Sequence, residues 1–229
     1  MTLIAALEVA GCFVAIGDAL TTRQSPPSVD SKIEILSLGK INAKLVGLAQ
    51  NEIVGLAQKI QIIEEQVIFG WSGLAYQAFS IANALRCKLK EARISKSVFD
   101  EILAEIPVNE RNDVGFFIAF AEDGAIRCYR NGMNAVPDTK YAKHIACAGS
   151  GLTFFSELIA QVDQGIDSRV TGTLNQMDLA ITVGLQIASS AHCLETLSAH
   201  CPRDGWGCAY EVATFVGGKP KKKSAQFFI

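Results

Sequence analysis

The residue with the clearest chemical interpretation is Thr2, which becomes the first residue of the chain if Met1 is removed. Threonine is small enough for routine removal of a preceding methionine. A hydroxyl on the first residue can use the free α-amine of that residue as its general base, so no histidine is needed. Such an amine has an ordinary pKa of about 7.7–8.0, which suits a proton acceptor near neutral pH. We therefore take Thr2 as the candidate nucleophile.

The histidines offer no comparable arrangement. The chain contains only His144, His192 and His200, and no serine lies in a Gly-x-Ser-x-Gly motif. A Ser-His-Asp triad needs a histidine beside the nucleophile. His144 falls in an expected strand and His192 in an expected helix, and both positions favour structural roles.

The seven cysteines do not form a metal-binding pattern. No CxxC pair occurs, whereas zinc sites of the ribbon type need closely spaced ligands. Dinucleotide and phosphate-binding motifs of the GxGxxG and Walker types are also absent. The sequence therefore predicts no cofactor and no metal, and its cysteine use is typical of a reducing cytoplasm.

Two apolar strands must carry Thr2. Residues 2–9 and 12–17 are apolar runs separated by Ala10-Gly11, which predicts an antiparallel hairpin covered on both faces. Consecutive prolines in residues 24–31 predict a loop. Further strands are expected at 32–38, 43–49, 53–57, 59–64 and 67–72.

A five-residue segment, Val-Gly-Leu-Ala-Gln, occurs twice, at 46–50 and 54–58. Two copies are too few for a solenoid. We interpret them as the two strands of a local hairpin that pair across Asn51-Glu52. This hairpin would belong to an enlarged insertion of strands around residues 24–58.

The rest of the chain alternates pairs of helices with strands. Apolar spacing predicts a helix at 74–90, and Ser95 is a candidate N-cap for a second helix that Pro107 ends. The two strands around Asp123-Gly124 predict a hairpin. The remaining expected elements are strands at 114–121, 125–130, 141–148, 208–216 and 224–229 and helices at 152–164 and 172–198.

This order of elements predicts an α+β fold. Antiparallel hairpins with helices in pairs favour a four-layer α/β/β/α sandwich of two antiparallel sheets. Strands and helices do not alternate singly, which argues against a Rossmann fold. With 229 residues, 49% of them hydrophobic, the chain is long enough for one large domain spanning residues 1–229.

The order of motifs resembles that of proteasome β-subunits and their simpler bacterial relatives, which are N-terminal nucleophile hydrolases. Thr2, two apolar strands and Gly17-Asp18 are similar to the opening of these proteins. Lys59 and the Val-Ile-Phe-Gly-Trp-Ser-Gly segment that ends at Gly73 resemble their second pair of strands. Two further motifs of the family are similar to Gly149-Ser150-Gly151 and to Arg203-Asp204-Gly205-Trp206-Gly207.

The resemblance implies roles for five catalytic residues. Thr2 would attack the scissile carbonyl while its amine relays the proton. Lys59, as a cation beside the nucleophile, would favour deprotonation of the hydroxyl and amine, and Asp18 would keep Lys59 charged and oriented. Ser150 and Asp204 would complete a hydrogen-bond network around the amine.

The resemblance also implies a substrate site. The backbone N–H of Gly73 would form the oxyanion hole, because glycine permits close approach of the substrate carbonyl. The backbone of Thr21 and Thr22 would pair with the substrate as an added strand. Trp71 would narrow the first specificity pocket.

Three departures from the family pattern concern the site. The segment between Asp18 and Lys59 is longer than usual, so Lys32 is a rival for the catalytic lysine. We prefer Lys59 because the motif that follows it fits through Gly73. Gly207 stands where the family often has a serine. Moreover, the mechanism requires that Met1 be absent from the mature chain.

Charge and composition limit the partners. A net charge of −2 favours neither nucleic acid nor an anionic membrane, and the basic cluster at Lys219 and Lys221–Lys223 is expected to be solvated. The apolar start has Glu8 and Gly11 and no basic flank, so we expect no signal peptide, no membrane span and a cytoplasmic protein. The resemblance implies a peptide or unfolded protein substrate, a homo-oligomeric ring and a possible separate ATPase unfoldase.

The sequence therefore leaves three hypotheses for the function of this protein. The leading one is a threonine endopeptidase enclosed in a ring. The second is a non-catalytic ring or scaffold subunit of the same fold, since fold alone does not establish activity. The third is a small-molecule amidase that uses the same N-terminal nucleophile.

Overall fold

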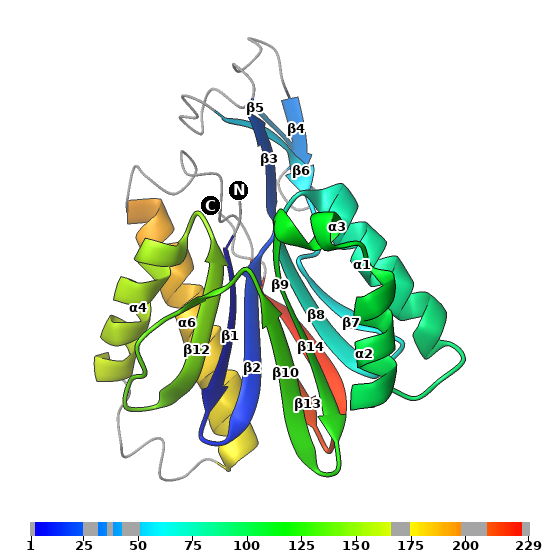
Figure 1. Cartoon of the computed structure of the whole chain (residues 1–229). Coiled ribbons are helices and arrows are strands. Elements are labelled where there is room, and N and C mark those ends of the chain that lie inside the picture. Colours follow the sequence, from blue (N-terminus) through cyan, green and yellow to red (C-terminus); the bar gives the residue numbers. More distant parts are fainter. Residues whose placement is uncertain are drawn as a thin grey trace.

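Two large antiparallel sheets, two small two-stranded sheets and a set of helices make up the described part of the computed structural model (Figure 1). The structure describes residues 3–24, 32–35, 39–42, 51–165, 175–197 and 210–225. The fold is mixed α+β, as the sequence predicts.

The larger sheet is built around the N-terminal hairpin. Its six strands run in the order β11-β12-β1-β2-β13-β14. The turn between β1 and β2 uses Ala10 and Gly11, both with positive φ, and this is the two-residue turn that the sequence predicts. The strands are β1 (Leu3–Val9), β2 (Cys12–Asp18), β11 (Asn134–Ala135), β12 (Ala142–Gly149), β13 (Tyr210–Val216) and β14 (Lys219–Ala225).

The smaller sheet has four strands in the order β10-β9-β8-β7, so β7 is at one edge. The hairpin around Asp123 and Gly124 that the sequence predicts joins β9 to β10. The strands are β7 (Ile60–Ile63), β8 (Val67–Gly73), β9 (Val114–Glu122) and β10 (Ala125–Asn131).

Helices cover the outer face of each sheet. Helices α4 (Leu152–Gly165) and α6 (Gln176–Leu197) share a buried cluster with β1, β2 and β12. Helices α1 (Ala75–Leu89) and α2 (Lys96–Glu105) share another with β8 and β9. A third cluster, including Ile4, Ala15, Ile68 and Phe117, lies between the two sheets. The layers are therefore helices, sheet, sheet and helices (Figure 1).

Local sequence signals explain how α2 begins and ends. The Ser95 hydroxyl accepts a hydrogen bond from the Val98 N–H at 3.3 Å, as an N-cap does. The helix ends at Glu105, two residues before Pro107. The short helix α3 (Val108–Asn112) and strand β11 were not predicted, because both are too short to show periodicity.

The hairpin predicted from the repeated segment is wrong. Asn51 and Glu52 are not a turn but the first residues of β6 (Asn51–Leu56), which pairs with β3 (Leu20–Gln24). Residues 46–50 lie outside the described part of the chain. A separate hairpin, β4 (Lys32–Ile35) with β5 (Gly39–Asn42), occupies the predicted insertion.

The C-terminal strand begins earlier than the sequence predicts. A strand was expected at 224–229, whereas β14 already starts at Lys219 and includes the lysine cluster; residues 226–229 lie outside the described part of the chain. Lysines are common on edge strands because they discourage pairing with another chain. Lys222 is nevertheless mostly buried, with 16% of its side chain exposed.

Glycines allow the two sheets to approach. A Cβ placed on Gly70 would lie 2.2 Å from the Phe117 ring, and one on Gly17 would lie 2.8 Å from Ile60 Cγ1. Real Cβ atoms do not approach other atoms so closely. At Gly17 the close contact between the two sheets therefore depends on the absence of a side chain. At Gly70 the absent side chain leaves room for the Phe117 ring of the neighbouring strand β9, which packs between the sheets.

We predict that Gly70→Ala destabilises the protein by about 1–3 kcal/mol, because the new methyl group overpacks the intersheet core against Phe117. Phe117→Leu creates space at the same point, so the two changes together should cost less than their sum. Urea unfolding of the wild type, the single variants and the double variant measures this coupling. Additive effects would contradict the packing account.

Candidate active site

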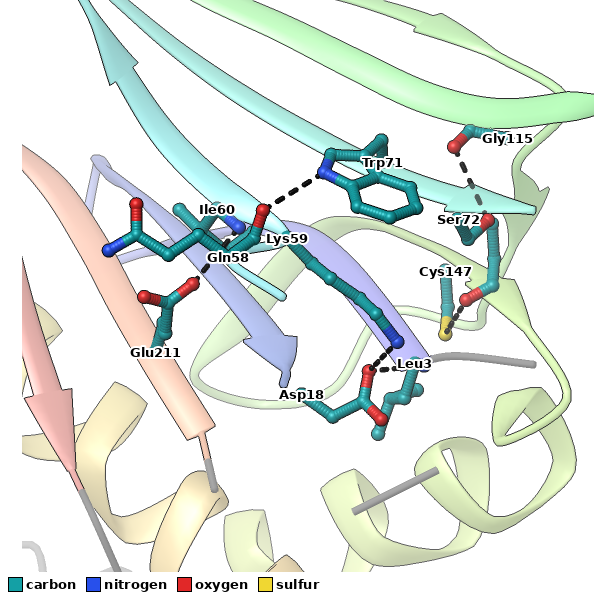
Figure 2. A network of polar contacts seen from close by, with 11 residues as sticks. Leu3, Asp18, Gln58, Lys59, Ile60, Trp71, Ser72, Gly115, Cys147 and Glu211 are labelled. Carbon is teal, nitrogen blue, oxygen red and sulfur yellow. Dashed lines mark hydrogen bonds and ion pairs between the residues drawn. The ribbon is translucent and has the colours of Figure 1, made fainter. Parts of the chain in front are cut away.

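The centre of the candidate site is an ion pair between the two sheets. Lys59 Nζ lies 3.1 Å from Asp18 Oδ1, with side-chain exposures of 1% and 0% (Figure 2). Asp18 ends β2 of the larger sheet, and Lys59 immediately precedes β7 of the smaller one. The two residues are 41 positions apart in the sequence, and packing of the sheets brings them together.

Burial makes this pair costly to break. Each charge loses its hydration, and the mutual attraction and further hydrogen bonds must offset that loss. The same carboxylate oxygen accepts a second hydrogen bond, from the Leu3 N–H at 3.0 Å. One buried cluster therefore contains Lys59, Asp18 and the first residue of β1.

Strand register brings the Gly149-Ser150 turn to the same cluster. Leu3 lies opposite Gly149 of β12, and Ile4 lies opposite Gly17 of β2. Ser150 follows Gly149 directly, at the exposed turn before α4. The sequence-predicted residues Asp18, Lys59 and Ser150 thus belong to segments that converge at one end of the larger sheet.

Gly73 lies at the end of β8 in a conformation that requires glycine. Its φ is +101°, and a Cβ there would lie 2.4 Å from the Asp113 carbonyl oxygen. The preceding residue, Ser72, donates a hydrogen bond to the Gly115 carbonyl at 3.3 Å. On the same strand, the Trp71 N–H binds the Lys59 carbonyl at 3.1 Å. The predicted oxyanion residue is therefore only two residues from a direct contact with Lys59.

Thr21 and Thr22 lie on β3, which continues the chain shortly after Asp18. They pair with Gly55 and Ile53 of β6, and the register shifts between them. In the described part of the chain β3 pairs only with β6, so one edge of this strand has no strand partner there. The predicted pairing of this backbone with a substrate strand stays a prediction.

Two predicted catalytic residues, Thr2 and Asp204, lie outside the described residues. The rival lysine, Lys32, lies on β4 opposite Asn42, in the two-stranded sheet with β5. Lys59, by contrast, is the lysine bound to Asp18. Of the two candidates, the geometry favours Lys59.

Trp71 supports the cluster from the smaller sheet. Its indole Nε1 donates to the Gln58 carbonyl at 3.0 Å, and its ring centroid lies 6.0 Å from Lys59 Nζ. The side chain is 1% exposed, and it packs edge-on against Phe79. Trp71 therefore forms part of the wall around Lys59; its role in substrate specificity stays a prediction.

Cys147 is a buried thiol close to the ion pair (Figure 2). Burial raises the pKa of the Cys147 thiol to about 12, and the nearby Asp18 charge adds to this effect. A thiolate, not a thiol, is the reactive form of cysteine. Cys147 therefore remains protonated near neutral pH and does not compete as a nucleophile.

Sequence reasoning missed two charged residues behind the site. Glu211 Oε1 lies 2.8 Å from Lys222 Nζ, and Glu211 Oε2 accepts a hydrogen bond from the Ile60 N–H at 3.2 Å. A single acidic residue in the apolar strand Tyr-Glu-Val-Ala-Thr-Phe-Val was a signal that could have identified Glu211. Lys222 belongs to a cluster of lysines, and because such clusters are usually solvated, no signal in the sequence indicated its buried contact.

Comparisons with known proteins do not identify a family. No protein-family model matches the sequence, and no curated protein matches it. Within the described ranges, no group of three potential metal-binding side chains occurs. The helices described here include none that is long and apolar enough to span a membrane.

We predict that Asp18→Asn lowers the free energy of unfolding by about 3–5 kcal/mol, because it leaves the buried Lys59 ammonium without its counter-charge. Asp100→Asn is a matched control, since Asp100 pairs with Lys96 at the surface, where both side chains are more than half exposed. That change should cost less than about 1 kcal/mol. Equal losses in urea unfolding would contradict the structural role of the buried pair.

A second prediction concerns Cys147. Because its pKa is raised to about 12, the thiol should resist iodoacetamide at about pH 8, while the exposed Cys87 reacts. Protection should be lost as the pH approaches 12 or when the protein unfolds in urea. Peptide mass mapping measures both sites, and equal rates for Cys147 and Cys87 in the folded protein would contradict the prediction.

Proposed function

We propose that this protein is a threonine peptidase of the N-terminal nucleophile class, with Thr2 as the first residue of the mature chain. The observation that carries the proposal is the position of the Leu3 N–H, 3.0 Å from the carboxylate that also binds Lys59. Leu3 follows Thr2 in the sequence, which supports a nucleophile next to this ion pair. A nearby cation would favour the deprotonated forms of the hydroxyl and the amine.

In the proposed mechanism the Thr2 amine accepts the proton from its own hydroxyl, and the hydroxyl oxygen attacks the scissile carbonyl. Lys59 favours the uncharged amine and stabilises negative charge on the attacking oxygen, because it is a nearby cation in a water-poor site. Asp18 keeps this cation charged and oriented. The amine then returns the proton to the leaving nitrogen, and water hydrolyses the acyl-enzyme.

The substrate would lie between β3 and the end of β8. The Gly73 N–H, at the end of β8, would bind the developing oxyanion. The edge of β3 that has no strand partner in the described part of the chain would add the peptide as a strand through Thr21 and Thr22. Ser150 and Asp204 would orient the amine.

The four-layer order of helices, sheet, sheet and helices supports an N-terminal nucleophile hydrolase fold. We further propose that copies of the chain form a ring in the cytoplasm, which would confine the active sites away from folded proteins. A separate ATPase would supply unfolded substrate where one is needed. No cofactor takes part in the proposed reaction.

We predict that Thr2→Ala abolishes the hydrolysis of fluorogenic peptides without changing the oligomeric state. Lys59→Met should lower kcat by about a hundredfold or more, because the cation that stabilises the attacking oxygen is removed. Lys32→Met is the matched control and should keep wild-type kcat. Initial rates over a peptide series with varied side chains before the scissile bond measure these effects.

Three results would contradict the proposal in different ways. Full hydrolysis by Thr2→Ala would exclude the nucleophile. A mature protein that keeps a residue before Thr2 would favour the non-catalytic subunit. A monomer or dimer on size-exclusion chromatography, active on small amides but not on peptides, would favour the amidase.

A further inference from the structure

Among the strands that the structure describes, β7 is the last of its sheet, and side chains hold its outer edge beside Lys59. The Trp71 N–H binds the Lys59 carbonyl, so Lys59 directs its backbone toward β8. Successive residues of an antiparallel strand direct their N–H and C=O groups to opposite sides. Ile60 therefore directs its own groups away from β8, toward the free edge of the sheet.

Glu211 and Lys222 satisfy both of these groups. Glu211 Oε2 accepts from the Ile60 N–H at 3.2 Å, and Lys222 Nζ donates to the Ile60 carbonyl at 3.2 Å. Lys222 Nζ also lies 2.8 Å from Glu211 Oε1. The two side chains are 8% and 16% exposed, so water competes little for these contacts. Together they supply the acceptor and donor that a neighbouring strand would.

The same contacts join the two sheets next to the ion pair. Glu211 lies on β13 directly opposite Gly17 of β2, and Ile60 packs in the space above Gly17. Gly17 precedes Asp18, and Lys59 precedes Ile60. Fixing Ile60 over Gly17 therefore fixes Lys59 beside Asp18.

We propose that Glu211 and Lys222 are positioning residues that hold Lys59 at the distance from Asp18 that catalysis requires. This inference rests on the proposed function. Trp71 fixes residues 58 and 59 from the β8 side, and the Glu211–Lys222 pair fixes residue 60 from the opposite side. The pair acts through the backbone of Ile60 and does not touch the reacting atoms.

The test compares Lys222→Met and Glu211→Gln with Lys221→Met, a control at the exposed neighbouring position of β14. Lys222 is partly exposed, so its replacement should leave the protein folded. We expect kcat for peptide hydrolysis to fall about 10- to 100-fold in both variants, with KM within about twofold, because Lys59 is misplaced rather than removed. Lys222→Arg should restore part of the loss.

The pH profile separates positioning from simple stabilisation. A displaced Lys59 no longer favours the uncharged amine, so the acid limb of the kcat profile should move to higher pH, as in Lys59→Met. Among the described residues, the titratable groups near this cation include Asp18 of β2, Cys147 of β12 beside Asp18 and, on the two sides of Ile60, Glu211 of β13 and Lys222 of β14. Lys221→Met should keep the wild-type profile.

Crystal structures of the same variants provide a readout that does not depend on activity. We expect the Lys59 Nζ–Asp18 Oδ1 distance to exceed 3.1 Å in Lys222→Met and Glu211→Gln and to be unchanged in Lys221→Met. An unchanged distance, or an unchanged kcat and pH profile, would overturn the inference. If the wild type hydrolyses no peptide, the proposed function fails, and the crystal structures alone decide whether the pair positions Lys59.

Discussion

A lysine and an aspartate that are both shielded from water persist as charges only while they remain together. Lys59 and Asp18 meet this condition across the interface of two sheets, so the pair depends on how closely those sheets approach. Gly17 permits that approach, and the hydrophobic cluster between the sheets maintains it. The charge at the candidate site is therefore a consequence of the packing of the whole fold.

The ion pair contacts both the segment next to the proposed nucleophile and the strand that carries the proposed oxyanion residue. On one side the ion pair binds the Leu3 N–H, next to the proposed nucleophile. On the other side, Trp71 of β8 contacts Lys59, and the same strand ends two residues later at the proposed oxyanion residue Gly73. Nucleophile, cation and oxyanion donor would thus be positioned by two rigid strands and one buried ion pair. A site built on strands holds its geometry better than one built on loops.

Sequence patterns predicted the elements that carry their own local signals. The β1–β2 hairpin, the β9–β10 hairpin, α2 with its Ser95 cap and the pairing of helices were all found within a few residues. The repeat around Asn51 was misread, because β6 pairs with β3, about 30 residues earlier in the chain. In the lysine cluster Lys219 and Lys221 are exposed as expected, and Lys222 is the exception. Glu211 and Lys222 could not be assigned from spacing, since their common partner Ile60 is about 150 residues away in the sequence. Asp18 and Lys59 were chosen through a resemblance, and their contact depends on tertiary packing.

The proposed mechanism requires a mature chain that begins with a reactive threonine beside this ion pair. Its most direct test is tandem mass spectrometry of the native protein after reaction with a peptide that carries a threonine-directed electrophile. The account predicts an adduct on Thr2, in an N-terminal peptide with no residue before it. An adduct on another side chain, or an unmodified peptide that still contains Met1, would contradict the account.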